Sequence, residues 1–197
     1  MAARPQPKTP RGEATRRAIL DAAEKVIGTA GYNDASIAEI TRVAGVAQGT
    51  FYIYFKGKEE VFRALVLSMG RHLRGAISDA IEASPDRIAA EREGLRAFLT
   101  FVASHPELYR IVQEALFVDP DAYRTYFQTF ADAYREGLEQ AAAAGDIRSG
   151  DAEVRAWALM GMAKTLGERA VVWGDKRPID EVVEAAHDLI VNGLGRS

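Results

Sequence analysis

The sequence predicts an all-α protein of about nine helices, and three patterns support this. Apolar residues recur every three or four positions through most of the chain, as they do on one face of a helix. No run alternates apolar and polar residues in the manner of a half-buried strand. The helical stretches are separated by residues that end helices, such as His105-Pro106 and Asp119-Pro120.

Composition excludes several classes of protein. The chain of 197 residues contains no Cys, which rules out disulfides, thiolate metal sites and a Cys nucleophile. Its start lacks the apolar segment of a signal peptide, and no run approaches the roughly 18 apolar residues of a membrane span. We therefore expect a cytoplasmic protein.

Charge is distributed unevenly along the chain. The formal net charge is -3, but residues 1–58 hold nine Lys or Arg against five Asp or Glu, a net charge of +4. The remaining residues hold 16 against 23, a net charge of -7. A basic end on an acidic remainder allows one end of a protein to approach a polyanion such as DNA.

Residues 1–12 have the composition of a disordered basic arm. They contain three prolines and three cations: Pro5, Pro7, Pro10, Arg4, Lys8 and Arg11. Such an arm either binds DNA phosphates or a minor groove, or is a solvated tail, and the composition favours the tail.

The first helix is predicted over residues 15–30, with Gly31 as its end. Arg16 and Arg17 then fall in its first turn, where the positive end of the helix dipole disfavours cations. A nearby phosphate would offset that cost, although an ordinary solvated pair is an equal alternative.

Residues 36–58 predict two short helices joined by a tight turn. Ser36 and Glu39 have the spacing of a capping box, in which each side chain satisfies a free N–H at the start of a helix. Gly45 ends this helix, because glycine adopts the left-handed conformation at little cost. A second helix starts at Gln48, and a helix presented outward in this way fits the major groove of DNA.

The same residues resemble a known family. The run A-G-V-x-x-G-T-x-Y-x-Y-F-x-x-K-E, residues 44–59, is similar to the signature of the TetR family of transcriptional regulators. The resemblance implies a three-helix DNA-binding head and a helical body that dimerises and holds a small-molecule effector. Ala47 departs from the family pattern, because many relatives have Ser or Thr there. Without a hydroxyl, the cap of the second helix is weaker by about 1 kcal/mol.

Roles in DNA binding follow from side-chain chemistry and from the resemblance together. Gln48 can form two hydrogen bonds with an adenine edge, and Thr50 can bond a base or a phosphate. The family pattern implies phosphate contacts for Tyr52 and Tyr54, whereas Phe51 and Phe55 are expected in the core. The predicted DNA-binding residues are Arg16, Ser36, Gln48, Gly49, Thr50, Tyr52, Tyr54 and Lys58.

The rest of the chain is predicted as six further helices. The first, residues 58–83, is about 39 Å long and could act as a lever between head and body. The others cover residues 88–103, 106–118, 121–144, 151–173 and 179–192. The predicted division is therefore an arm over residues 1–12, a DNA-binding domain over 13–58 with its motif at 36–55, and an effector-binding and dimerisation domain over 59–197.

Aromatic residues recur at helical spacing in three of these helices. Such a stripe is either plain core or the wall of a pocket, in which Tyr hydroxyls orient a ligand. With the resemblance, it predicts a pocket for an amphipathic effector of aromatic or acyl type. The predicted pocket residues are Phe98, Phe101, Tyr109, Phe117, Tyr123, Tyr126, Phe127 and Phe130.

The last two helices are predicted to form the dimer surface. Each has an apolar stripe, and two helices from each of two chains would form a four-helix interface. The alternative is that these residues are buried inside one chain. The predicted interface residues are Trp157, Met160, Ala163, Leu166, Val182, Ala186 and Leu189.

No catalytic, metal-binding or nucleotide-binding motif is present. The three His residues are isolated, and the sequence contains no HExxH, GxSxG, GxGxxG or Walker pattern. We predict no enzymatic activity, no cofactor and no metal. The expected function is a transcriptional repressor that binds a palindromic DNA operator as a homodimer and is released by a small molecule. The alternative is a helical small-molecule-binding protein or an enzyme without DNA-binding activity.

Overall fold

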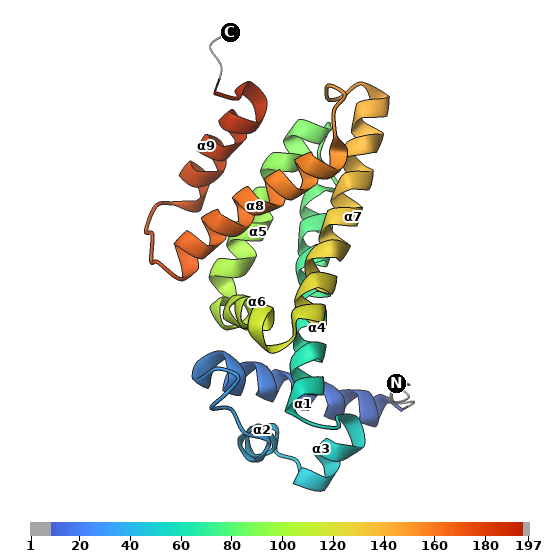
Figure 1. Ribbon diagram of the computed structural model, residues 1–197, viewed down its shortest axis with the longest axis vertical. Helices are drawn as coiled ribbons and strands as arrows, with labels where there is room; N and C mark the ends of the chain where they lie inside the picture. Colours follow the sequence, from blue (N-terminus) through green and yellow to red (C-terminus); the bar gives the residue numbers. More distant parts are fainter. Residues whose placement is uncertain (1–8, 195–197) are drawn as a thin grey trace. The chain divides into compact units, whose positions relative to one another are not determined.

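The computed structural model describes residues 9–194, which form nine α-helices and no strand (Figure 1). This confirms the predicted all-α fold. Two helices, α6 and α9, have the bounds predicted from the sequence. The helices are α1 (Pro10–Ala30), α2 (Ile37–Ala44), α3 (Gln48–Tyr54), α4 (Lys58–Ile81), α5 (Arg87–Ser104), α6 (Pro106–Val118), α7 (Pro120–Ala144), α8 (Ala152–Val171) and α9 (Ile179–Asn192).

The chain divides into two compact units. The first, here called the head unit, holds the residues up to Met69 together with Pro106–Tyr126. The second, the body unit, holds Gly70–His105 together with the residues from Phe127 onward. Helices α4 and α7 each pass from one unit into the other, and α6 shares a unit with α1, α2 and α3. The functional division at residue 58 remains a prediction.

Helix α1 begins earlier than expected. The Thr9 hydroxyl accepts a hydrogen bond from the Gly12 N–H at 3.2 Å, and Pro10 occupies the first helical position, which suits its fixed φ. The expectation of disorder up to residue 12 is therefore wrong for residues 10–12, and Arg16 lies beyond the first turn of the helix. Residues 1–8 of the predicted arm lie outside the described part of the chain.

The predicted caps of α2 are largely confirmed. The Ser36 hydroxyl accepts a hydrogen bond from the Glu39 N–H at 3.1 Å, and Gly45 ends the helix with a φ of 66°. The Glu39 carboxylate binds Arg42 at 2.9 and 2.6 Å, so it does not complete the expected capping box. The Arg42 guanidinium accordingly lowers the pKa of Glu39.

The core of the head unit is formed by aliphatic residues and phenylalanines. Phe51 and Phe55 are 0% and 2% exposed, which confirms the prediction that both are core residues. Burying one such side chain stabilises the fold by about 1.5–3 kcal/mol. Other large buried side chains of the head unit include Ile19, Ile27, Ile40, Val61, Phe62 and Val66.

Helix α6 packs closely against α1 in the head unit. A Cβ built on Gly28 would lie 2.5 Å from the Glu107 Cβ, so only glycine permits this approach. The Glu114 carboxylate accepts a hydrogen bond from the Tyr32 N–H at 3.0 Å. Nearby, Arg63 of α4 binds Asp119 through two hydrogen bonds of 2.7 Å, and this guanidinium lowers the pKa of Asp119.

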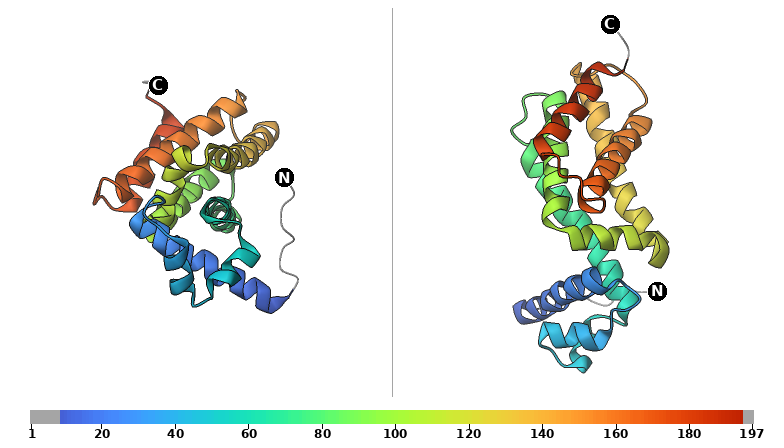
Figure 2. Two further views of the ribbon diagram at one scale, coloured as in Figure 1. Left: turned by 60° about the horizontal axis from the view of Figure 1, so that its bottom comes forward. Right: turned by 90° about the vertical axis from the view of Figure 1, so that its left-hand side faces the viewer.

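In the body unit, α8 and α9 pack against α5 (Figure 2). The buried cluster at this contact contains Leu95, Leu99, Val183 and Ala186. Close helix approach is again possible because of a glycine, since a Cβ on Gly167 would lie 2.9 Å from the Phe98 ring.

A buried polar network joins α5 to α7 in the body unit. Glu91 is 6% exposed, accepts a hydrogen bond from the Arg87 Nε at 2.6 Å and accepts another from the Tyr134 hydroxyl. The Arg87 guanidinium also lies 5.0 Å from the centre of the Tyr134 ring. Burial, followed by the charge of Glu91, raises the pKa of Tyr134. Removal of one partner would leave a buried polar group unsatisfied, so the network favours a single packing of the two helices.

Candidate nucleic-acid interface

Helix α3 is held to the head unit by one side and open to solvent on the other (Figure 1). Phe51 is fully buried, whereas Gln48 and Gly49 are exposed and Thr50 is half-buried. Tyr52 is 43% exposed, so it is not a core residue, and Tyr54 is half-buried. Five of the eight predicted DNA-binding residues therefore lie on this one short helix.

The surface of α3 is open enough for close approach by another molecule. A Cβ built on Gly49 would meet no atom within 4 Å. The first turn of the helix contains no acidic residue that would repel a phosphate. The start of α3 is thus accessible both sterically and electrostatically.

The start of α3 lacks a side-chain cap, as the sequence predicted. Ala47 occupies the capping position with φ -68° and ψ 148°, and no side chain accepts a hydrogen bond from the first N–H groups. The Ala47 carbonyl accepts hydrogen bonds from the Thr50 and Phe51 N–H groups at 2.8 and 3.3 Å. The helix is therefore held by its backbone and by the burial of Phe51.

Lys58 has a different environment from the one expected of a phosphate-binding residue. Its Nζ donates hydrogen bonds to the carbonyl oxygens of Tyr32, Asn33 and Ala35 at 2.6, 3.2 and 2.8 Å. These bonds use all three ammonium hydrogens. Nζ also lies 4.4 Å from the centre of the Tyr32 ring. Lys58 thus holds the loop between α1 and α2, and sequence reasoning missed this because the acceptors are backbone atoms 23–26 residues earlier.

The other two predicted contact residues lie on neighbouring elements. The Arg16 guanidinium of α1 lies 5.3 Å from the centre of the Phe55 ring, directly after α3. Ser36 is exposed and uses its hydroxyl oxygen to cap α2, which leaves the hydroxyl hydrogen for another acceptor. Both residues belong to the head unit together with α3.

The eight residues of the predicted aromatic pocket are divided between the two units. Only Phe101 lines the cavity found in the body unit, and Phe98 instead packs against the α5–α8–α9 cluster. Tyr109 and Tyr126 are 5% and 7% exposed, while Phe117 is 84% exposed. Four of the eight, Tyr109, Phe117, Tyr123 and Tyr126, belong to the head unit, whereas Phe127 and Phe130 belong to the body unit. Helical spacing shows which residues share a face but not which helices face one another.

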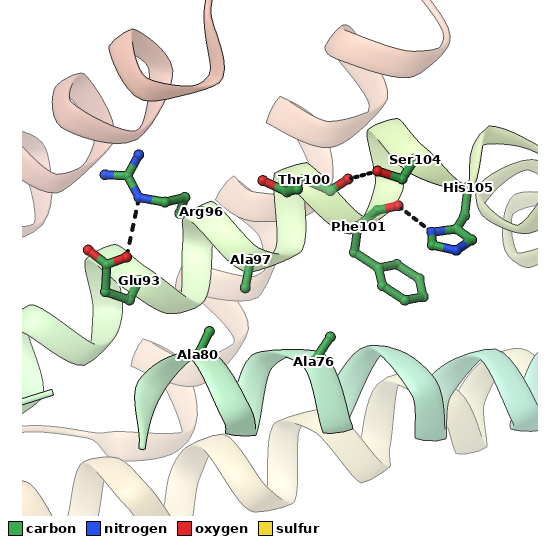
Figure 3. Close-up of a pocket in the computed structure, with 9 residues that line it drawn as sticks. All are labelled: Ala76, Ala80, Glu93, Arg96, Ala97, Thr100, Phe101, Ser104 and His105. Atoms are coloured by element: carbon green, nitrogen blue, oxygen red, sulfur yellow. Dashed lines mark hydrogen bonds and ion pairs between the residues drawn. The ribbon is translucent and has the colours of Figure 1, made fainter. Parts of the chain in front are cut away.

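The cavity of the body unit lies between α4 and α5 and has a volume of about 400 Å³ (Figure 3). It is lined by Ala76, Ala80, Glu93, Arg96, Ala97, Thr100, Phe101, Ser104 and His105.

The predicted dimer residues separate into two groups. Ala186 is buried, and Ala163, Leu166 and Val182 pack against the cluster around Leu95, so these four serve the core of one chain. For these four residues the packing favours the alternative interpretation, because α5 covers these parts of the stripes on α8 and α9. Trp157 and Leu189 are each 41% exposed, and Met160 is half-buried.

Residues 9–194 lack both a metal-binding cluster and a membrane-spanning helix. In this part of the chain, no three His, Cys, Asp or Glu residues are grouped so that they could hold a metal ion. None of its helices combines the length and apolar character needed to cross a membrane.

Comparison with known proteins finds similarity to bacterial transcriptional regulators. Residues 19–65 match a family model described as "Bacterial regulatory proteins, tetR family". The chain is 31% identical over 125 residues to the HTH-type transcriptional regulator EthR of Mycolicibacterium smegmatis, a match that covers 59% of this chain and 58% of EthR. It is 28% identical over 186 residues to the HTH-type transcriptional regulator YdgC of Bacillus subtilis, covering 93% of this chain and 95% of YdgC.

The fold also resembles that of solved structures. The transcriptional regulator FadR from Bacillus subtilis, solved in complex with stearoyl-CoA, superposes with a TM-score of 0.80 at 21% identity. The superposition covers 91% of this chain and 99% of that one.

Proposed function

Because this chain belongs to the TetR family of bacterial regulatory proteins, we propose that it is a transcriptional regulator that binds operator DNA through α3. In this proposal it acts as a repressor, two copies bind a palindromic operator, and a small molecule releases them. The match to EthR spans little more than half of that protein.

The observation that carries the proposal is the environment of α3. This seven-residue helix buries Phe51 in the head unit and leaves Gln48, Gly49 and Tyr52 exposed. The major groove admits an α-helix, and exposed amide and hydroxyl groups are the chemistry that reads base edges and phosphates. The net charge of +4 in residues 1–58 supports the same orientation toward DNA.

The contacts divide by role in this proposal. Gln48 and Thr50 read base edges, Tyr52, Tyr54, Arg16 and Ser36 bind phosphates, and Gly49 lets the backbone approach. Lys58 does not bind phosphate but fixes the loop on which α2 and α3 depend, since its hydrogens are already used.

The shortness of α3 is the reason for proposing two copies. At 1.5 Å per residue the helix is about 10 Å long and reaches few base pairs. Each good base contact discriminates by only about 1–3 kcal/mol. Two chains double the contacts and read a palindrome whose half-sites lie one or more helical turns apart.

The fold and the cavity support the proposal that a small-molecule effector binds the body unit. FadR, which shares the fold, was solved with stearoyl-CoA, and the body unit of this chain contains a cavity large enough for a small molecule.

Operator binding can be tested with DNA from upstream of the protein's own gene. We expect affinity to fall steeply between about 50 and 200 mM salt, since phosphate contacts release counterions. Gln48→Ala should cost about 1–3 kcal/mol on the operator and relax selectivity at one base pair. Tyr52→Phe should weaken binding to all duplexes alike, because a phosphate contact carries no sequence information.

A matched control is Gln140→Ala, at an exposed position of α7. It should bind DNA like the unmodified chain in fluorescence anisotropy. If the chain bound no duplex at low salt, or if Gln48→Ala behaved like Gln140→Ala, the alternative of a helical small-molecule-binding protein or enzyme would be favoured.

A further inference from the structure

The cavity of the body unit has a size and shape suited to a small molecule. Its volume of about 400 Å³ lies within the range of about 300–1,000 Å³ found for ligand sites. Its lining residues on α5 run from Glu93 to His105, which is about 18 Å along a helix. The ligand that fits is therefore long and narrow.

One side of the cavity is apolar. Ala97 and Phe101 point from α5 toward Ala76 and Ala80 of α4 (Figure 3). Because alanine has the smallest side chain that carries a Cβ, the two facing helices leave space that their own side chains do not fill. This side can accept an alkyl chain or an aromatic ring, and each CH₂ removed from water contributes about 0.8 kcal/mol.

The one cation of the cavity is already neutralised. All three nitrogen atoms of the Arg96 guanidinium face a carboxylate: Nε lies 3.2 Å from Glu93, one terminal nitrogen lies 3.4 Å from Glu184, and the other pairs with Asp180. Glu184 also binds Arg92, so two positive charges face three negative charges and this end has a formal net charge of -1. An anionic head group would thus meet more repulsion than attraction there.

The opposite end of the cavity offers mainly hydrogen-bond acceptors. The His105 Nδ1 lies 2.9 Å from the Phe101 carbonyl, and since a carbonyl oxygen only accepts, Nδ1 must carry the hydrogen (Figure 3). In the neutral imidazole, Nε2 is then an acceptor. Ser104 donates its hydroxyl hydrogen to the Thr100 carbonyl at 2.8 Å and keeps its oxygen lone pairs. Only the Thr100 hydroxyl can still donate.

We propose that this cavity binds a cationic amphiphile, with an apolar body between α4 and α5 and a protonated amine that donates hydrogen bonds at the rim. The positive charge of the amine complements the carboxylates around Arg96, which places the amine at that end of the cavity. The Phe101 and His105 rings stack with their centres 4.4 Å apart and give the apolar body an aromatic surface. The inference rests on the proposed function in that it names the class of the effector.

The test uses three probes with the same ten-carbon tail: decylamine, decanol and decanoate. Binding to the full-length protein is measured by isothermal titration calorimetry without DNA, at neutral pH and at monomeric probe concentrations. We expect decylamine to bind at least about tenfold more tightly than decanoate, a difference of about 1.4 kcal/mol, with decanol between them. Equal or tighter binding of decanoate, or no binding of decylamine, would overturn the proposal.

Two variants locate the site. Ala97→Leu should weaken decylamine binding by about tenfold or more, because its side chain occupies the space between the helices. Glu93→Gln should weaken it by about threefold to fivefold, as expected for loss of a partly exposed ion pair. If Ala97→Leu fails to fold, Glu93→Gln carries the test alone. Unchanged binding in the folded variants would place the amine elsewhere and contradict the proposal.

Controls come from the same unit. Ala185→Leu on α9 and Glu153→Gln on α8 make the same chemical changes at exposed positions and should leave decylamine binding unchanged. The operator assay without amphiphile separates the two proposals. A chain that binds its operator but not decylamine refutes the effector class only, and a chain that binds decylamine but no DNA refutes the regulator only.

Discussion

At the scale of single residues, the ammonium group of Lys58 fixes the loop that precedes the proposed DNA-binding helices. It joins the first residue of α4 to three carbonyl groups between α1 and α2. Hydrogen bonds to a charged group contribute about 1.5–3 kcal/mol each when buried, and less when partly exposed as here. The position of α2, and with it α3, depends on this contact.

We expect Lys58→Met to lower the free energy of unfolding by about 2–3 kcal/mol, because three carbonyl groups lose a charged donor while the aliphatic stem is retained. Urea unfolding followed by circular dichroism measures the change. Lys56→Met is the control, since Lys56 lies two residues earlier and is exposed. If Lys58→Met unfolded like Lys56→Met but bound DNA with a smaller salt dependence, the phosphate role expected from the sequence would be correct.

Gly28 allows α1 and α6 to approach each other closely in the head unit. Gly28→Ala would place a Cβ 2.5 Å from the Glu107 Cβ and 3.2 Å from its Cα, so the backbone of α1 or α6 must move. We expect a loss of about 1–3 kcal/mol in the free energy of unfolding, the usual cost of overpacking.

Gly75→Ala serves as the matched control, because a Cβ on Gly75 of α4 meets no atom within 4 Å. There the same substitution should stabilise the protein by about 0.5–1 kcal/mol, since alanine is the better helix former. Thermal melts of the two variants that shift in the same direction would contradict the packing of α1 against α6.

At the scale of elements, α3 is the helix with the weakest local determinants. It has seven residues and no side-chain cap, and a helix this short is not stable in isolation. Ala47→Ser should add a hydroxyl acceptor at the capping position and stabilise the protein by about 0.5–2 kcal/mol. Ala38→Ser, at an exposed position inside α2, should not stabilise it. Chemical unfolding of both variants makes the comparison, and equal effects would show that the α3 cap is unimportant.

The sequence was sufficient to predict most helices, because residues close to each boundary determine where a helix begins and ends. Ser36 and Gly45 cap α2, and Pro106 starts α6, as expected from their backbone preferences. The start of α1 was missed although its signal was present, since Thr9 followed by Pro10 is a typical helix beginning.

The sequence was less informative about features that depend on which helices pack against one another. The outward face of α3 could be predicted because Phe51 and Phe55 lie on its other side. The carbonyl groups that bind Lys58 could not be predicted, because they are backbone atoms distant from Lys58 in sequence. The cavity was missed because the residues that leave space are alanines, which no aromatic pattern marks.

At the scale of the whole molecule, we propose that a second copy covers the exposed apolar residues of α8 and α9. Val154, Trp157, Leu189 and Val191 are between 41% and 63% exposed in the single chain. Isolated apolar residues on a surface need no explanation, but four on two consecutive helices fit the four-helix interface predicted from the sequence.

We expect sedimentation at micromolar concentration to give the mass of two chains, and Trp157→Glu to give the mass of one, because a carboxylate would be buried without a partner in the interface. Phe117→Glu is the control, since it makes the same kind of change at a residue of α6 that is 84% exposed. If the interface lies on α8 and α9, the Trp157→Glu monomer should keep salt-dependent binding to random duplexes but lose its preference for a palindrome, because each chain then contributes one α3 alone. A single-chain mass for the unmodified protein would contradict the dimer, and a dimeric Trp157→Glu would place the interface on another surface.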